Sequence, residues 1–167
     1  PSIILKYDQV GNVIWEQQHD ESFNDIMVFN SNIYFAALVE SYNDGNIGNG
    51  IILEPKGYGD AFIAKSDLNG NFIWASMGDH ENTYNGDSYG IDIIVDENEN
   101  IYMAGYFRAN VIFGSDTLIV NSGLRDGFIV KCSSDGDFLW ANQVDEIAND
   151  VAVDTANNSF ILYDKYI

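Results

Sequence analysis

The chain carries an internal repeat, and this feature limits the folds open to it more than any other. Three segments align without gaps, with a Lys, a Gly and a Trp recurring in phase: residues 3–15, 62–74 and 128–140. Lys6 and Lys65 are 59 positions apart, and Lys65 and Lys131 are 66 positions apart. A period of about 60 residues, with one loop of variable length inside it, indicates a repeat architecture.

A second unit recurs between the copies of the first, at residues 23–37, 89–105 and 148–162. Each copy has an apolar run, a polar turn and another apolar run. In the middle copy, residues 91–95 and 101–105 are rich in Ile, Val and Tyr, and Asp, Glu and Asn fill the turn between them. Runs of this kind predict β-hairpins. No window keeps the apolar spacing of an amphipathic helix, so we expect an all-β fold.

Several predicted strands are apolar at consecutive positions, as in residues 62–64 and 3–5. Such strands must be covered on both faces, whereas a two-sheet sandwich would leave one face wet and show cleaner alternation. We therefore expect four-stranded antiparallel blades of a β-propeller, with a sandwich or a β-solenoid as the alternatives. The chain would form a single propeller segment, with a half blade at 1–18, blades at 23–77 and 89–143, and a half blade at 148–167.

This segment amounts to about 2.5 to 3 blades, and known propellers contain at least about four. The remaining blades would come from the same chain or from another chain. In the half blades, strands such as residues 3–5 and 160–162 would present unpaired edges, which invite association.

The chain is strongly acidic, with 26 Asp and Glu residues, 7 Lys and Arg residues and a formal net charge of -19. Nucleic acid and anionic membrane surfaces are therefore excluded as partners, because binding to either depends on Lys and Arg near phosphate groups. No segment approaches the roughly 20 apolar residues of a membrane-spanning helix, so we expect no membrane insertion. Cys132 is the only cysteine, which excludes an internal disulfide and a zinc cluster of several thiolates.

The long connections of the expected blades fall on one face, and binding specificity is usually located in such loops. They span residues 40–59, 78–88 and 108–125, and the other face has only tight turns. Their acidic side chains and tyrosines suit a carbohydrate or a basic protein surface. The candidate ligand-binding residues are Tyr42, Asp44, Tyr58, Asp79, Tyr84, Asp87 and Asp116.

Two further patterns suggest chemistry but also have structural explanations. Asp96, Asn98 and Asn100 place side-chain oxygens at alternate positions, as calcium-binding loops do, but an Asp that caps its own hairpin turn accounts for the same residues. Calcium is the only cofactor that the sequence suggests. His19 and His80 lie in acidic connections without a nucleophile motif such as Gly-x-Ser-x-Gly, so we expect solvated loop residues and no catalytic residue.

The repeat resembles the seven-bladed β-propeller repeat family called SBBP over almost the whole chain. The resemblance is carried by residues 60–65, 69–71, 74, 89–96, 100–107, 113–118, 122–123 and 126–131. The first copy departs from the pattern, because Pro1 stands at the position of Asp60 and residues 43–59 replace a Phe-Gly segment. Members are mostly secreted or surface proteins of bacteria, and the resemblance implies a repeat scaffold without a defined activity.

These observations favour a noncatalytic binding or scaffold module of a secreted or cell-surface bacterial protein, with a protein or a carbohydrate bound at the face of the long loops. The alternative is a propeller enzyme, a lyase or a glycosidase, that uses carboxylates in these loops. The distance between acidic side chains distinguishes the binding module from the enzyme. A pair of carboxylates about 5 to 9.5 Å apart in a pocket would favour glycoside chemistry, and dispersed acids would favour binding.

Overall fold

The computed structural model describes residues 1–80, 86–121 and 125–163. All of the regular elements in these ranges are β-strands paired in antiparallel sheets, so the all-β prediction is confirmed. The first sheet is a hairpin of β1 (Ser2–Tyr7) and β2 (Val13–His19). The last sheet is a hairpin of β16 (Ala148–Val153) and β17 (Ser159–Tyr163).

Two four-stranded sheets lie between these hairpins. The first contains, in spatial order, β3 (Ser22–Phe29), β4 (Asn32–Glu40), β7 (Gly59–Asp67) and β8 (Phe72–Met77). The second contains β10 (Ser88–Val95), β11 (Ile101–Phe107), β14 (Asp126–Cys132) and β15 (Phe138–Val144). In each sheet, every strand pairs with the next of the four along the chain.

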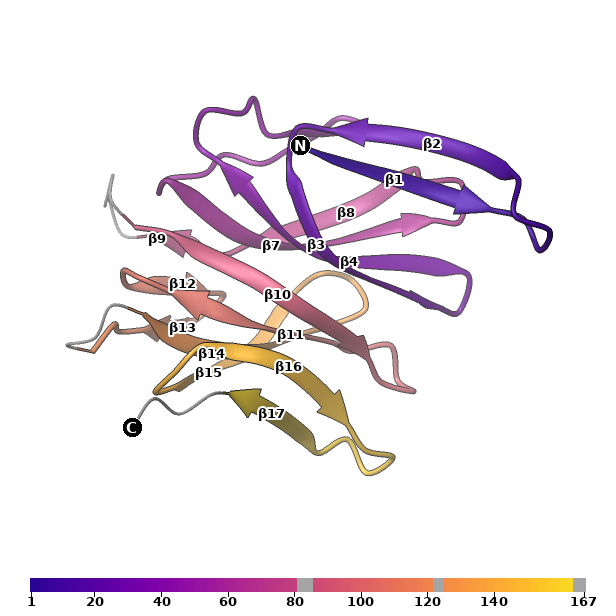
Figure 1. The fold of residues 1–167 in the computed structure, drawn as a ribbon. Coiled ribbons are helices and arrows are strands. Elements are labelled where there is room, and N and C mark those ends of the chain that lie inside the picture. Colours follow the sequence, from indigo (N-terminus) through magenta and orange to yellow (C-terminus); the bar gives the residue numbers. More distant parts are fainter. Residues whose placement is uncertain (81–85, 122–124, 164–167) are drawn as a thin grey trace.

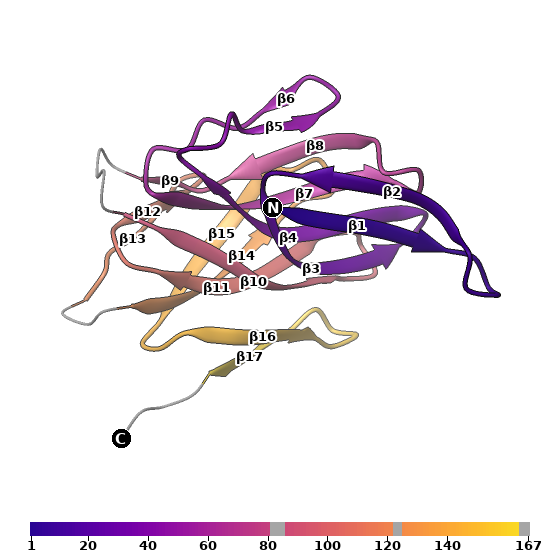
Figure 2. The same cartoon turned by 45° about the horizontal axis from the view of Figure 1, so that its top comes forward.

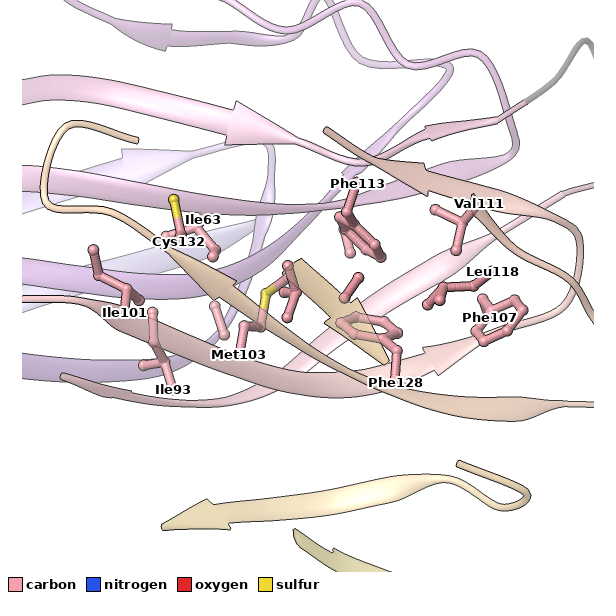
Figure 3. Packing of buried hydrophobic residues seen from close by; sticks show 14 of the residues in the cluster. Ile63, Ile93, Ile101, Met103, Phe107, Val111, Phe113, Leu118, Phe128 and Cys132 are labelled. Carbon is pink, nitrogen blue, oxygen red and sulfur yellow. The ribbon is translucent and has the colours of Figure 1, made fainter. Parts of the chain in front are cut away.

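The four sheets form four layers stacked face to face, from β1–β2 at one end to β16–β17 at the other (Figure 1). One apolar core lies between the two four-stranded sheets and contains Ile63, Met103 and Phe128 (Figure 3). Tyr34 also belongs to this core. A second core lies between β1–β2 and the first four-stranded sheet, and a third lies between the second four-stranded sheet and β16–β17.

The prediction about consecutive apolar residues is right for the central strands and wrong for the first strand. Phe62, Ile63 and Ala64 have no solvent exposure, because adjacent layers cover both faces of β7. Ile3 and Leu5 on β1 are 57% and 40% exposed, because β1 lies in an outermost layer and only its inner face is packed. Burial on both faces therefore depends on a layer's position in the stack.

The long connections contain further small sheets. Within residues 43–59, β5 (Asn46–Gly48) and β6 (Ile51–Ile52) form a hairpin beside β8 (Figure 2). In the second four-stranded sheet, β12 (Val111–Phe113) and β13 (Asp116–Leu118) form the equivalent hairpin. The short strand β9 (Asp79–His80) pairs with β12 and so joins the connections of the two four-stranded sheets.

Among the described residues, no helix is long and apolar enough to cross a membrane.

Candidate functional site

The long connections lie together at one end of the strands, and the short hairpin turns lie at the other. In Figure 1, β9, β12 and β13 are at the left, and the turns of β3–β4, β10–β11 and β16–β17 are at the right. Side chains reach the loop end because the first strand of each four-stranded sheet begins at this end and the second strand finishes there. Tyr89 near the start of β10 is thus directly opposite Tyr106 near the end of β11.

Tyr89 and Tyr106 form the centre of a group that we call the arginine–tyrosine cluster, which consists of Asp87, Tyr89, Tyr106, Arg108 and Arg125. The two tyrosine rings stack with centroids 4.7 Å apart and an interplanar angle of 15°. The guanidinium carbon of Arg125 lies 4.8 Å from the centroid of the Tyr106 ring, and that of Arg108 lies 5.9 Å from it. Both arginines of the chain therefore contact one aromatic ring.

Asp87 holds one of these arginines in place. Its Oδ2 atom lies 3.1 Å from Nη1 of Arg108, and its backbone carbonyl accepts a hydrogen bond from the backbone N–H of Arg108 at 2.9 Å. Burial raises the pKa of Asp87, and Arg108 and Arg125 oppose that shift. Burial also raises the pKa values of Tyr89 and Tyr106, so both phenols stay neutral and can donate hydrogen bonds at neutral pH.

Two exposed tyrosines extend this surface. Tyr42 is 78% exposed, and its hydroxyl donates a hydrogen bond to Glu40, which raises the pKa of Tyr42. The backbone N–H of Ser41, the residue before Tyr42, donates a hydrogen bond to the carbonyl of Tyr58 at 3.0 Å, so the two tyrosines lie on neighbouring segments. Tyr58 is 62% exposed, and its backbone N–H donates to the carbonyl of Gly86 at 2.7 Å. Aromatic and cationic side chains at this end thus come from two connections, residues 40–59 and 108–125, and from the strands β10 and β11.

A buried polar group supports the same loop end, and it corrects our expectation for His80. His80 is 1% exposed and not solvated. Its Nδ1 atom lies 2.8 Å from the carbonyl oxygen of Asn110, so this nitrogen carries a proton. Its Nε2 atom lies 3.1 Å from Oδ1 of Asp60 and 3.3 Å from Oγ of Ser88. The sequence did not reveal this burial, because it results from the pairing of β9 with β12.

Asp60 also holds the loop that precedes its own strand. Its Oδ2 atom accepts a hydrogen bond from the backbone N–H of Lys56 at 2.7 Å, and burial raises its pKa. Asp126, at the equivalent repeat position, accepts a hydrogen bond from the backbone N–H of Asn121 at 2.6 Å. A Ser–His–Asp nucleophilic triad needs the Asp and the Ser on opposite ring nitrogens, but here both face Nε2 of His80. The group is therefore a support for the loops.

The other candidate residues have different positions. Asp79 forms an ion pair with Lys56, with Oδ2 and Nζ 2.7 Å apart. Asp44 accepts a hydrogen bond from the backbone N–H of Asn46 at 3.0 Å. Asp116 accepts one from the backbone N–H of Ala141 at 2.8 Å and so holds the β12–β13 hairpin against β15. Tyr84 lies outside the described residues. Of the seven candidates, Asp87 belongs to the arginine–tyrosine cluster.

Four members of the cluster were not among the candidates predicted from the sequence: Tyr89, Tyr106, Arg108 and Arg125. A signal was present, because Arg108 and Arg125 stand at the two ends of one connection in a chain with only seven basic residues. The tyrosines stand at mirrored positions in one predicted hairpin. What brings all four together is the pairing of β10 with β11 and of β11 with β14.

The possible calcium ligands lie in the β10–β11 turn, where they bond to one another. Oδ1 of Asp96 accepts hydrogen bonds from the backbone N–H groups of Asn98 and Asn100, both at 2.9 Å. The side-chain amide of Asn100 donates to Oδ2 of Asp96 at 2.9 Å. Because Asn100 turns its nitrogen toward Asp96, the three side chains do not offer a converging set of oxygens. The described residues contain no group of three or more His, Cys, Asp or Glu side chains that could hold a metal ion.

A comparison of the chain with protein-family models finds no matching family, and a comparison with curated proteins finds no similar sequence.

Proposed function

We propose that this chain is a noncatalytic binding module of a secreted or cell-surface bacterial protein, built from the blades of a β-propeller. Three observations support the blade assignment: the repeat of about 60 residues, the four-stranded antiparallel order of the two central sheets, and the face-to-face packing of all four layers. The bacterial and extracellular setting follows from the resemblance to the SBBP family.

The proposed ligand is a carbohydrate that carries a carboxylate group, bound at the loop end. One observation carries this proposal, namely the arrangement of both arginines of the chain around the stacked rings of Tyr89 and Tyr106. A guanidinium group binds a carboxylate through paired hydrogen bonds, and tyrosines supply flat contact area together with a polar hydroxyl. The net charge of -19 opposes long polyanions, so a ligand with one or few carboxylates fits best.

The arrangement of the acidic side chains favours binding over the enzymatic alternative. Asp87, Asp79 and Asp116 each have a different partner: Arg108, Lys56 and the backbone N–H of Ala141. Glycoside hydrolysis needs two carboxyl groups that face each other across one sugar ring. Acidic groups that are each held by a separate partner do not supply such a pair.

Isothermal titration calorimetry with an oligosaccharide of uronic acids, and with its neutral counterpart, tests the proposal. We expect binding of the acidic sugar only, and a loss of affinity of about 10- to 100-fold in Arg125→Ala, since a hydrogen bond to a charged group contributes about 1.5 to 3 kcal/mol. Lys56→Ala is the matched control, because it removes a cation from the same loops but outside the cluster. Equal binding of the neutral sugar, or unchanged affinity in Arg125→Ala, would contradict the proposed site.

A further inference from the structure

An aspartate recurs at one position of the first strand of the last three layers: Asp25 on β3, Asp92 on β10 and Asp150 on β16. Each follows a β-bulge, since the strand register shifts between Phe23 and Asp25, between Gly90 and Asp92, and between Ala148 and Asp150. A bulge re-aims the side chain that follows it. The three aspartates therefore have the same local geometry in three successive layers.

Each of the first two aspartates reaches the backbone of the next layer. Oδ2 of Asp25 accepts a hydrogen bond from the backbone N–H of Ile93 at 3.0 Å, and Oδ2 of Asp92 accepts one from the backbone N–H of Val151 at 2.7 Å. Ile93 directly follows Asp92, and Val151 directly follows Asp150. Each of these hydrogen bonds therefore places the carboxyl group of one layer next to the carboxyl group of the following layer. We call Asp25, Asp92 and Asp150 the aspartate row.

Asp92 is the middle member and interacts with both of the others. Burial is the largest cause that raises its pKa to about 7, and hydrogen bonding to the carboxyls of Asp25 and Asp150 raises it further, against the hydrogen bond from Val151. Two carboxyl groups can share a hydrogen bond only if one of them holds a proton.

Other strands packed against β10 also carry ionisable groups. Except for Tyr34 on β4, a buried phenol whose hydroxyl has no hydrogen-bond partner among the described residues, these groups have partners elsewhere. On β4, Glu40 accepts from the hydroxyl of Tyr42. On β7, Asp60 faces His80. Nζ of Lys65 lies 3.9 Å from Oε2 of Glu99. Asp67 accepts hydrogen bonds within its own turn. On β11, Tyr102 donates to Asp96, and Tyr106 packs against Arg125. The carboxyl groups that act on Asp92 are those of the two aspartates from β3 and β16.

We propose that the aspartate row is a proton-dependent clasp between neighbouring layers, which closes when Asp92 is protonated and weakens when Asp92 ionises. In the closed state, the protonated carboxyl of Asp92 donates its O–H to a neighbouring carboxylate while its Oδ2 atom accepts the N–H of Val151. Ionisation releases this proton to water and places a negative charge on Asp92 next to the other two carboxyl groups of the row. The proposal does not depend on the proposed ligand-binding function.

The direction of the pH effect follows from linkage. The pKa of Asp92 is raised from its ordinary value of 3.8 to about 7. Between these two pH values, the folded chain holds a proton that the unfolded chain has released. The contribution of Asp92 to the free energy of unfolding therefore falls as pH rises through this window and levels off above it. Glu21, Asp60 and Asp87 also have raised pKa values, so the contribution of Asp92 must be measured as a difference between variants.

Thermal unfolding of the full chain between about pH 4.5 and about pH 9, a range that spans the raised pKa of Asp92, tests the clasp through Asp92→Asn. Asparagine accepts from Val151 and donates to a neighbouring carboxylate, so it imitates the protonated state at every pH. We expect the variant to match the wild type near the acid end and to unfold about 3 to 8 °C higher at the alkaline end. Asp135→Asn is the matched control, since it removes the same charge from an exposed turn and should keep the wild-type pH slope.

Two results would overturn the proposal. One is an equal pH slope in Asp92→Asn and Asp135→Asn. The other is a midpoint near the ordinary value for Asp92 when the carboxyl carbons of the wild-type chain are titrated by NMR, a measurement that does not require a variant to fold. Asp92→Ala adds a check on the hydrogen bond itself, because it should lower the unfolding temperature at every pH.

Discussion

Single residues connect neighbouring layers at the end of the strands opposite the loops. The indole N–H of Trp15 and the ammonium group of Lys6 both donate to the carbonyl of Leu68, at 3.2 and 2.8 Å. Trp74 and Lys65 repeat this arrangement one layer further on, donating to the carbonyl of Ser134 at 3.1 and 3.5 Å. The Lys and Trp that define the repeat are therefore contacts between layers, which explains why they recur together.

Trp74→Phe isolates the hydrogen bond of this contact. The ring keeps most of its packing, but the Ser134 carbonyl loses a donor, so we expect the free energy of unfolding to fall by about 1 kcal/mol. Trp74→Ala should cost more, about 2 to 4 kcal/mol, because it also removes a large half-buried side chain. Urea denaturation measures both changes. Trp140→Phe is the control, because the Trp140 indole has no acceptor among the described residues, and a larger loss there than in Trp74→Phe would contradict this account.

At the scale of the hairpin, one side chain organises each tight turn. Oδ1 of Asp67 accepts hydrogen bonds from the backbone N–H groups of Asn69 and Asn71, at 2.8 and 3.0 Å. Asp8, Asp96 and Asp154 bond to their own turns in the same way. In the β14–β15 turn, the hydroxyl of Ser133 takes this role and accepts from the backbone of Asp135 and Asp137. The backbone of the turn requires a hydrogen-bond acceptor at this position, but the acceptor does not need to carry a charge.

This comparison predicts the acid sensitivity of the turns. Hydrogen bonds from Asn71 lower the pKa of Asp67, so its stabilising contribution is present above pH 4 and is lost as pH falls through the lowered pKa. Asp67→Ser should unfold close to the wild type at neutral pH and lose less stability in acid, since Ser133 serves in the same place. Asp67→Ala should unfold at a lower temperature throughout. Circular dichroism melts at neutral pH and in acid measure this, and equal acid sensitivity in wild type and Asp67→Ser would contradict it.

The hairpins could be predicted from the sequence because their signals are local, whereas the candidate site could not. Apolar runs and Asp–Gly turns lie within about 15 residues of each other, and the repeat showed which hairpins correspond. The burial of His80 depends on the pairing of two short strands, β9 and β12, that have little pattern of their own. The stacking of Arg125 on Tyr106 likewise depends on the register between β11 and β14. Such contacts are set by tertiary structure.

At the scale of the whole molecule, the two outer faces of the stack expose apolar residues from different positions of the repeat. Ile3 and Leu5 on β1 occupy the repeat positions of Phe62 and Ala64, which pack on the preceding layer and have no exposure. At the other end, Phe160 and Leu162 on β17 are 57% and 61% exposed. Their counterparts on β11, Tyr102 and Ala104, pack on the following layer and are 1% and 0% exposed.

One outer face therefore has the residues that normally contact a preceding layer, and the other has those that contact a following layer. Two copies of this 167-residue chain could pack head to tail with the geometry already present between its layers, which is a heterologous contact. Because exposed apolar surface favours association and the charge of -19 opposes it, we expect self-association that strengthens as salt screens the charge.

Light scattering of the chain at low and high salt measures this association. Phe160→Lys places a charge in one of the two faces and should shift the population toward the monomer. Ile119→Lys makes the same change at a residue that is 61% exposed in a connection outside both faces, so it should leave the association unchanged. A monomer at all salt concentrations would contradict the prediction, and so would equal effects of the two substitutions. A difference between them would locate the association on the outer face of β17, as expected if neighbouring copies continue the stack.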